Sequence, residues 1–219
     1  MSQDNILYFP NLVDLRIAPK CGWQSTMQFH LIMLGNSRFK DHPGGLKYTH
    51  VKGGPQNWRD YEWWAHGDIM DIPFRKNSIR FVIKRDPVKR FLSAIDYLQT
   101  QKIVKLTNRD YPATGFSSLD RAVSAMERGV LMNVHLLPQT YFYGNDPNKY
   151  DHIYDINNIN DALLHIKEIC NYNMKRMKKY PVADLHKNKS IKSLSLELTD
   201  DLEEKIKKVY KIDYDNGWC

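Results

Sequence analysis

Short apolar runs alternate with amphipathic segments along this chain. The apolar runs have the length of strands, and the amphipathic segments repeat with helical spacing. The first strand is expected to begin near Leu12. Strands that alternate with helices predict an α/β protein whose central sheet is mainly parallel. The expected strands are 12–18, 81–84 and 150–154, and the expected helices are 27–34, 160–172 and 199–214.

The last predicted helix, residues 199–214, has a clear beginning and a clear apolar face. Thr199 is a good N-cap, and acidic residues in the first turn favour a helix N-terminus. We expect this helix to pack against the core through one face, which is a structural role. The residues of that face are Leu202, Ile206, Val209 and Tyr210.

The 219 residues are enough for one α/β core, and no repeat, linker or domain break interrupts them. We therefore expect a single domain over residues 1–219. Two long irregular stretches, 36–60 and 106–118, contain Gly and Pro. Loops of this length are usually functional, and in a transferase they would suit acceptor recognition.

The net charge of +7 suits an anionic partner, which leaves nucleic acid, a membrane surface or a small anionic ligand open. The lysines within 175–192 are expected to be a solvated basic patch. The apolar runs are too short to span a bilayer, and no secretory signal is recognised. Three cysteines without paired or metal-ligand spacing indicate reduced thiols. We therefore expect a cytoplasmic protein with no membrane span and no metal.

The segment 81–94 combines a buried strand, a sharp turn and a helix with polar side chains. Pro87 suits the first helical position, and Asp86 can cap that helix. Arg85 then lies at the carboxyl end of a strand, where open α/β sheets bind ligands. Together with the hydroxyl of Ser93, its guanidinium is suited to a phosphate dianion.

A second phosphate-binding candidate follows the strand at 12–18. A short loop containing Gly22 leads into the helix at 27–34, so backbone N–H groups at the helix start would point at an anion. Lys20 adds a mobile positive charge. This is not a Walker A loop, which argues against an ordinary ATPase or kinase.

Together these segments resemble sulfotransferases that use 3′-phosphoadenosine 5′-phosphosulfate (PAPS). The family's 3′-phosphate motif is matched by Arg85, Asp86, Pro87, Arg90, Ser93 and Ala94. Its 5′-phosphosulfate loop, Pro-Lys-x-Gly-x-Thr/Ser, is matched up to Gly22. The resemblance implies that Lys20 neutralises the bridging oxygen as sulfate leaves. Trp23 replaces a small residue and Gln24 stands at the hydroxyl position, so Ser25, Thr26 or the Gln24 amide would supply that ligand. The expected loop ligands are Lys20, Cys21, Gly22, Trp23, Gln24, Ser25 and Thr26.

Three further segments carry the resemblance. His66-Gly67-Asp68 resembles the His-Gly-His element of carbohydrate sulfotransferases, which supplies the base that accepts the acceptor's proton. His66 is our first candidate for this base and His135 the second, while Asp68 could serve or could orient His66. His135, Pro138 and Gln139 also match that group. The stretch with His186, Asn188 and Ser190 precedes a helix ending in Tyr210, Asp213 and Tyr214. The resemblance implies that this stretch, and not the helix, would help to close over the nucleotide.

The resemblance implies a P-loop-like, three-layer α/β fold with helices flanking the sheet. It also implies sulfuryl transfer from PAPS to a hydroxyl or amine without a metal, with 3′-phosphoadenosine 5′-phosphate (PAP) as product. The carbohydrate type is closer than the small-molecule type, so a glycan is the expected acceptor. Because no membrane anchor is seen, a soluble bacterial or viral relative is expected. Trp58, Trp63 and Trp64 suit either stacking on the acceptor or a place in the core.

Three alternatives stay open at this point. A nucleotide phosphotransferase of related fold would bind ATP more tightly than PAP. A non-catalytic protein that binds PAP or a glycan would fit the departures at Trp23 and Gln24. Nucleic-acid binding is suggested by charge alone and would be steeply salt-dependent, but no binding motif supports it.

Overall fold

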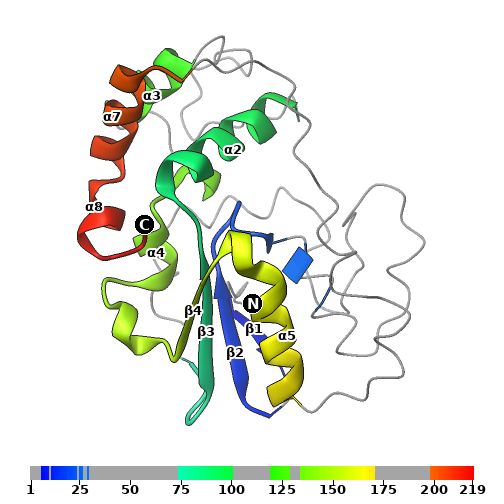
Figure 1. Cartoon of the computed structure of the whole chain (residues 1–219). Coiled ribbons are helices and arrows are strands. Elements are labelled where there is room, and N and C mark those ends of the chain that lie inside the picture. The colour runs from blue at the N-terminus through cyan, green and yellow to red at the C-terminus, as the bar shows by residue number, and fades with distance from the viewer. Residues whose placement is uncertain are drawn as a thin grey trace.

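A four-stranded sheet lies at the centre of the protein in the computed structural model (Figure 1). The strands stand in the order β1-β2-β3-β4; β1 is antiparallel to β2, whereas β2, β3 and β4 are mutually parallel. They are β1 (Ile6–Phe9), β2 (Val13–Ile17), β3 (Ile79–Lys84) and β4 (His152–Asp155). The structure describes residues 6–9, 11–23, 25–26, 29, 74–100, 119–128, 134–170 and 198–219.

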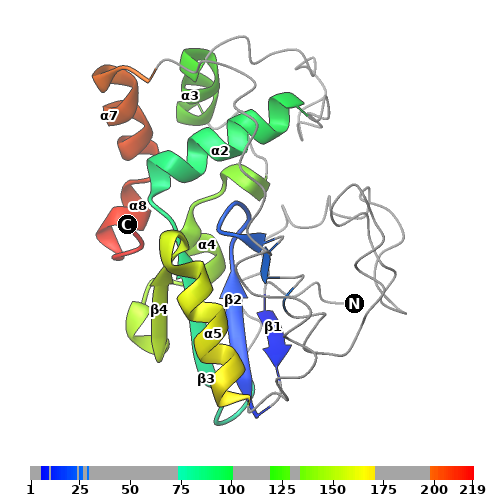
Figure 2. The same cartoon turned by 45° about the vertical axis from the view of Figure 1, so that its right-hand side comes forward.

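Helices cover the sheet and extend beyond one end of it. Helix α5 lies along one face of the sheet, and α2, α3 and α7 gather beyond the carboxyl ends of β2 and β3 (Figures 1 and 2). The helices are α2 (Pro87–Thr100), α3 (Leu119–Glu127), α4 (Gln139–Tyr143), α5 (Ile159–Ile169), α7 (Asp200–Val209) and α8 (Lys211–Asp215), with 3₁₀ turns at Val134–Leu136, Pro147–Lys149 and Ile156–Asn158. The predicted α/β fold with a mainly parallel sheet and flanking helices is confirmed.

The two faces of the sheet are covered by different helices. Phe81 of β3 packs edge-on against His165 of α5, with ring centroids 5.2 Å apart. Side chains alternate between faces along a strand, so Arg16, the neighbour of Leu15 in β2, lies on the face opposite to Phe81. There Nη1 of Arg16 donates to the carbonyl of Phe142 in α4. Because both faces are covered, every residue of β2 is buried, including the charged Asp14 and Arg16, whose side chains are hydrogen-bonded on the face opposite to Leu15.

Among the described residues, buried apolar side chains form two clusters. The sheet cluster joins the strands to α4, α5 and Trp218, and the helix cluster joins α2, α3 and α7. In the helix cluster, Ile206 and Tyr210 are buried and Leu202 and Val209 pack against them, which is the face predicted for residues 199–214. The carboxyl ends of the strands therefore lie between two packed regions.

The two predicted helix caps are correct, and two predicted boundaries are wrong. Asp86 accepts a hydrogen bond from the Lys89 N–H at the start of α2, and Thr199 accepts one from Leu202 at the start of α7. The first strand is β1 and not the strand near Leu12. Strand β1 has only four residues and lies at the sheet edge, so it left no clear pattern in the sequence. The single helix expected over 199–214 is interrupted at Tyr210. Of the helix expected at 27–34 the structure describes only residue 29, which is helical, and the stretches 36–60 and 106–118 lie outside the described residues.

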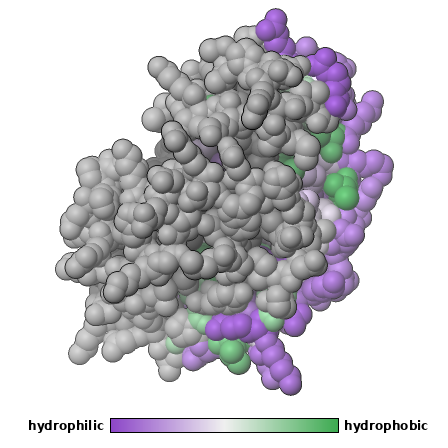
Figure 3. All heavy atoms as spheres, turned by 180° about the vertical axis from the view of Figure 1, so that it is seen from behind, coloured by the Kyte–Doolittle hydropathy of each residue, from purple (hydrophilic) through white to green (hydrophobic). Residues whose placement is uncertain are grey.

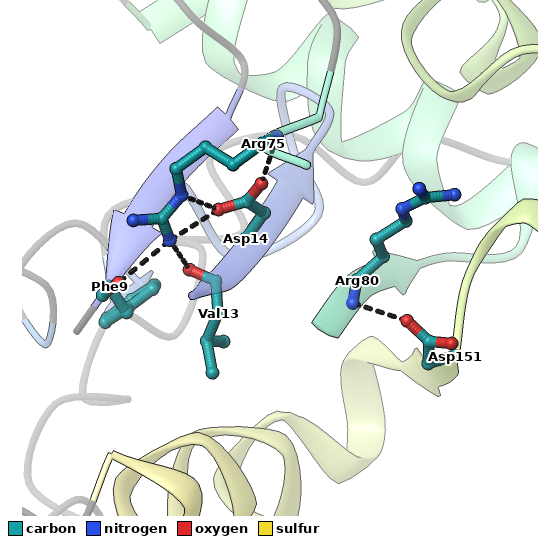
Figure 4. A network of polar contacts seen from close by, with 6 residues as sticks. All are labelled: Phe9, Val13, Asp14, Arg75, Arg80 and Asp151. Carbon is teal, nitrogen blue, oxygen red and sulfur yellow. Dashed lines mark hydrogen bonds and ion pairs between the residues drawn. The ribbon is translucent and has the colours of Figure 1, made fainter. Parts of the chain in front are cut away.

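A buried ion pair fixes the amino end of β2 (Figure 4). The Asp14 carboxylate is fully buried and accepts from Nε of Arg75 at 2.6 Å and from the Arg75 N–H at 2.9 Å. Nη2 of Arg75 also donates to the carbonyls of Phe9 and Val13, at 2.8 and 2.7 Å. Because these partners stand at the turn between β1 and β2, we assign this network a structural role.

The beginning of β3 is fixed in a similar way. The N–H of Arg80 donates to Oδ2 of Asp151 at 2.7 Å, which joins the beginning of β3 to the residue before β4 (Figure 4). Both networks lie at the ends of the parallel strands opposite to the loops that follow them. The carboxyl ends of the parallel strands take no part in these two networks.

Few large hydrophobic side chains of the described residues are exposed. Seen from behind, its visible border carries hydrophilic residues with scattered hydrophobic ones between them (Figure 3). The exposed large hydrophobic side chains are those of Leu12, Ile153, Leu164 and Ile212. Among the described helices, none combines the length and apolar character that crossing a bilayer requires.

Candidate anion-binding site at the carboxyl ends of β2 and β3

The loop after β2 has a backbone shape that depends on a glycine. Lys20 and Gly22 both have positive φ, at 68° and 87°, and the Cys21 N–H closes a turn onto the carbonyl of Ala18 at 3.2 Å. A Cβ on Gly22 would lie 2.4 Å from Cδ1 of Ile159 at the start of α5. A left-handed backbone and a close neighbour together explain why glycine occupies this position.

The chain turns helical directly after this loop. Residues 23, 25 and 26 have helical backbone, and the N–H of Thr26 donates to the carbonyl of Gly22 at 3.0 Å. Oγ1 of Thr26 donates to the same carbonyl at 2.9 Å, and both Ser25 and Thr26 are buried. The arrangement is a strand, a glycine loop and a helix start, as predicted for an anion cradle.

The second predicted motif forms the junction between β3 and α2. Arg85 follows the last residue of β3, and Pro87 begins α2. Nη1 of Arg85 donates to the carbonyl of Lys20 at 2.9 Å, and Nε of Arg90 donates to the carbonyl of Pro19 at 3.0 Å. The two motifs are 65 residues apart in sequence at the Arg85–Lys20 contact, yet their residues are directly hydrogen-bonded.

Positive charge is concentrated at this junction. The ammonium of Lys20 lies over the ring of Tyr97, 4.4 Å from its centroid. Burial, and then the neighbouring charge of Arg85, lowers the pKa of Lys20 to about 8, although Asp96 acts in the opposite direction. Burial also lowers the pKa of the Arg85 guanidinium. Cations that are partly desolvated and close together favour a bound anion.

Arg90 is fully buried and holds the loop from α2. Besides Pro19, it binds the carbonyl of Leu137 through Nη1 at 2.6 Å. Its Nη2 is buried and has no hydrogen-bond partner within the part of the chain that the structure describes. The donor set of Lys20, Arg85 and Arg90 therefore fits a phosphate or sulfate group.

His135 lies beside the same lysine. Its ring packs edge-on against Tyr97, with centroids 4.8 Å apart, so Tyr97 contacts both His135 and Lys20. Burial, and then the charges of Lys20 and Arg90, lowers the pKa of His135 to about 3. The imidazole is therefore neutral at physiological pH and is a weak base.

Comparison with known proteins agrees with this geometry. A model of the sulfotransferase family matches residues 11–216, which is nearly the whole chain. The chain belongs to the sulfotransferase family. No curated protein and no solved structure gives a match. The match spans the strand–loop–helix segment, the β3–α2 junction and most of the C-terminal region, so the predicted membership is confirmed.

The structure describes one group of the predicted site residues and not the other. The first group lies at the carboxyl ends of β2 and β3 and consists of Lys20, Cys21, Gly22, Trp23, Ser25, Thr26, Arg85 and His135, with Ser93 partly exposed on α2. The second group lies outside the described residues and consists of Gln24, His66, Asp68, Asn188 and Ser190.

Three residues of this site received no role from sequence. Tyr97 lies on α2 beyond the motif, and only the position of that helix relative to the loop brings it against Lys20. Arg90 was part of the motif pattern, whose spacing marks it, but its contacts with Pro19 and Leu137 depend on the fold. Gln139 belonged to a matched segment and gave no indication of its partners.

Proposed function

We propose that this sulfotransferase uses PAPS as its donor and transfers the sulfuryl group to a hydroxyl or amine, with a carbohydrate as the acceptor class. The observation that carries the proposal is the pair of hydrogen bonds from Arg85 and Arg90 to the loop of Lys20. They bring both anion-binding segments to one place, as a donor with phosphate groups at two positions requires. The acceptor class is supported only by the resemblance at 66–68 and 135–139.

The donor's two anionic ends would have different partners. The loop of residues 20–26, with its N–H groups, would hold the 5′-phosphosulfate. Arg85 and Ser93 would hold the 3′-phosphate, and Asn188 and Ser190 would close over the nucleotide. A bound 3′-phosphate is what distinguishes PAPS from ATP and ADP, so Arg85 is the residue that we expect to set nucleotide selectivity.

The chemistry is a substitution at sulfur in which the acceptor's oxygen or nitrogen forms the new bond to sulfur. The bond from sulfur to the bridging oxygen breaks, and its electron pair stays on the 5′-phosphate. Lys20 would stabilise the charge that develops there, because its ammonium is desolvated and held near the loop. Positioning and charge stabilisation would supply most of the acceleration, as in phosphoryl transfer.

A base must take the proton that the acceptor loses. His66 is our first choice, with Asp68 as its partner or substitute. His135 is less suited, since a pKa of about 3 leaves little driving force for proton uptake. We expect its neutral ring, packed on Tyr97, to serve as part of the site wall.

Calorimetric titration of the full chain with PAP and with ADP tests the donor. We expect PAP to bind more tightly than ADP, and Arg85→Ala to weaken PAP by about tenfold or more with little effect on ADP. Arg128→Ala, which removes an exposed arginine after α3, is the matched control and should bind as the wild type does.

Failure to bind PAP by a folded wild type would contradict the proposal. Selective PAP binding without PAP release from PAPS, over a panel of glycan and other hydroxyl acceptors, would favour the non-catalytic alternative. Tighter binding of ATP than of PAP would favour a phosphotransferase.

A further inference from the structure

The side chain of Gln139 is fully buried between the two anion-binding segments. Its Oε1 accepts from the N–H of Arg85 at 2.9 Å and from Sγ of Cys21 at 3.3 Å. Its Nε2 donates to the carbonyl of Arg85 at 2.7 Å and to that of Trp218 at 2.9 Å. All four hydrogen-bonding positions of the amide are therefore used.

The backbone of Gln139 is fixed independently of its side chain. Asp213 of α8 is fully buried, and its Oδ2 accepts from the N–H of Gln139 at 2.8 Å. Its Oδ1 accepts from the N–H of Thr140 at 2.7 Å. The carboxylate thus satisfies two N–H groups at the start of α4, which intrahelical bonds leave unpaired. The amide of Gln139 projects from an anchored helix start.

Both peptide groups that flank the Cα of Arg85 are held by this one amide. Fixing the N–H and the carbonyl of the same residue restrains the direction in which its side chain leaves the backbone. The bond from Cys21 adds a restraint on the neighbouring loop. A change of about 1 Å in the position of a binding group is enough to weaken a charged contact severely.

We infer that Gln139 is a positioning residue, which sets the direction of the Arg85 guanidinium relative to the loop of Lys20 and so determines selectivity for a nucleotide 3′-phosphate. The inference rests on the proposed function. It goes beyond that function because Gln139 does not itself contact the donor.

Only an amide satisfies this set of partners. A glutamate has the same shape but no hydrogen to donate when ionised, so its carboxylate would face the carbonyls of Arg85 and Trp218. A methionine of similar length would leave all four partners without a bond. Gln139→Glu therefore disturbs the Arg85 peptide with the least change in packing.

The test compares PAP and ADP affinities by calorimetry in the full-length wild type and Gln139→Glu. We expect the ratio of PAP to ADP affinity to fall by about tenfold or more, chiefly through weaker PAP binding. Tyr210→Phe is the matched control. It removes a buried hydroxyl that donates to the carbonyl of Leu136 at 2.6 Å in the helix cluster, and its affinity ratio should equal that of the wild type.

A selective wild type with an equally selective Gln139→Glu variant would overturn the inference while leaving the proposed function intact. An equal loss of selectivity in Tyr210→Phe would also overturn it, because general loosening would then explain the effect. A wild type that binds neither nucleotide would overturn the proposed function and the inference together.

A measurement on the wild type decides the matter if Gln139→Glu does not fold. Amide hydrogen exchange of peptides covering residues 80–90 is followed with and without saturating PAP. Tightening of the Arg85 peptide on Gln139 predicts slower exchange in this segment with PAP and a smaller change with ADP. Identical exchange with both nucleotides would overturn the inference.

Discussion

Lys20 shows how one residue is prepared for its role by its surroundings. Its backbone is left-handed, its carbonyl is bound by Arg85 and its ammonium lies on Tyr97. A lysine normally carries its charge up to about pH 10. Here burial and the Arg85 charge lower the pKa to about 8, so the charge is lost at a lower pH than in an ordinary lysine.

We therefore expect PAP binding to weaken as the pH rises through about 8. Below that pH the ammonium is charged and attracts the donor's phosphates, whereas above it the amine is neutral. The phosphates stay ionised throughout this range, because their second pKa is about 6. Calorimetric titrations at several values between about pH 7 and about pH 9.5 measure the effect.

Lys20→Met provides the control, since its side chain does not titrate. Its affinity for PAP should be lower than that of the wild type at neutral pH and should change little across the same range. A wild-type dissociation constant that stays constant through about pH 9 would show that the charge of Lys20 does not contribute to binding.

Much of this residue-level chemistry was predictable from sequence, and the rest depends on the fold. The loop and the arginine were recognisable because each candidate phosphate-binding motif is a local pattern: a glycine turn with a lysine before a helix, and an arginine between a strand and a helix. The contact of Tyr97 with Lys20 and the four bonds of Gln139 were not predictable. Their partners come from different elements, whose relative positions no local pattern specifies.

Helix α2 connects the candidate site to the helix cluster, and Arg90 makes its polar contacts with the loop after β2. The guanidinium is fully buried and binds the carbonyls of Pro19 and Leu137, which belong to two other segments. A lysine has one nitrogen and cannot reproduce this fork. We expect Arg90→Lys to lower the free energy of unfolding by about 1–3 kcal/mol, because one buried carbonyl loses its partner.

Urea denaturation followed by circular dichroism measures this change, with Arg128→Lys as the control. Arg128 is exposed, and the same substitution there should change stability by less than about 0.5 kcal/mol. An Arg90→Lys variant as stable as the control would mean that Arg90 does not anchor the loop.

At the scale of the elements, the helix caps were predictable from the sequence, whereas the strand β1 and the helix break at Tyr210 were not. The caps could be predicted because the side chains of Asp86 and Thr199 accept from N–H groups only three residues further along the chain. The short strand β1 was missed because four residues give too little alternation. At Tyr210 the backbone leaves helical geometry, with φ −97° and ψ 19°, and the side chain is fully buried with its hydroxyl on the carbonyl of Leu136. The apolar face predicted for residues 199–214 continues through Tyr210, so it did not indicate an interruption there.

At the scale of the whole molecule, the residues that the structure describes form two hydrophobic clusters, which are connected through the candidate site. Asp213 of α8 binds the start of α4, and Gln139 of α4 binds Arg85 at the start of α2. Trp218 is fully buried in the sheet cluster, 5.1 Å from the Tyr143 ring, and its Nε1 donates to the carbonyl of Gly144 at 2.8 Å. Trp218, close to the C-terminal end, therefore belongs to the same hydrophobic cluster as the first strands of the chain.

These connections predict that the clusters unfold together, as expected for one domain over residues 1–219. Trp218→Ala removes a large side chain from the sheet cluster and should cost about 3–5 kcal/mol. Ile206→Ala does the same in the helix cluster, at about 2–5 kcal/mol. Each should move one common transition, with coincident midpoints from far-ultraviolet circular dichroism and from near-ultraviolet signals of the aromatic rings. If Ile206→Ala separated an early loss of helix from a later loss of the aromatic signal, the clusters would be independent units. The candidate site would then form only when the two separately folded clusters associate.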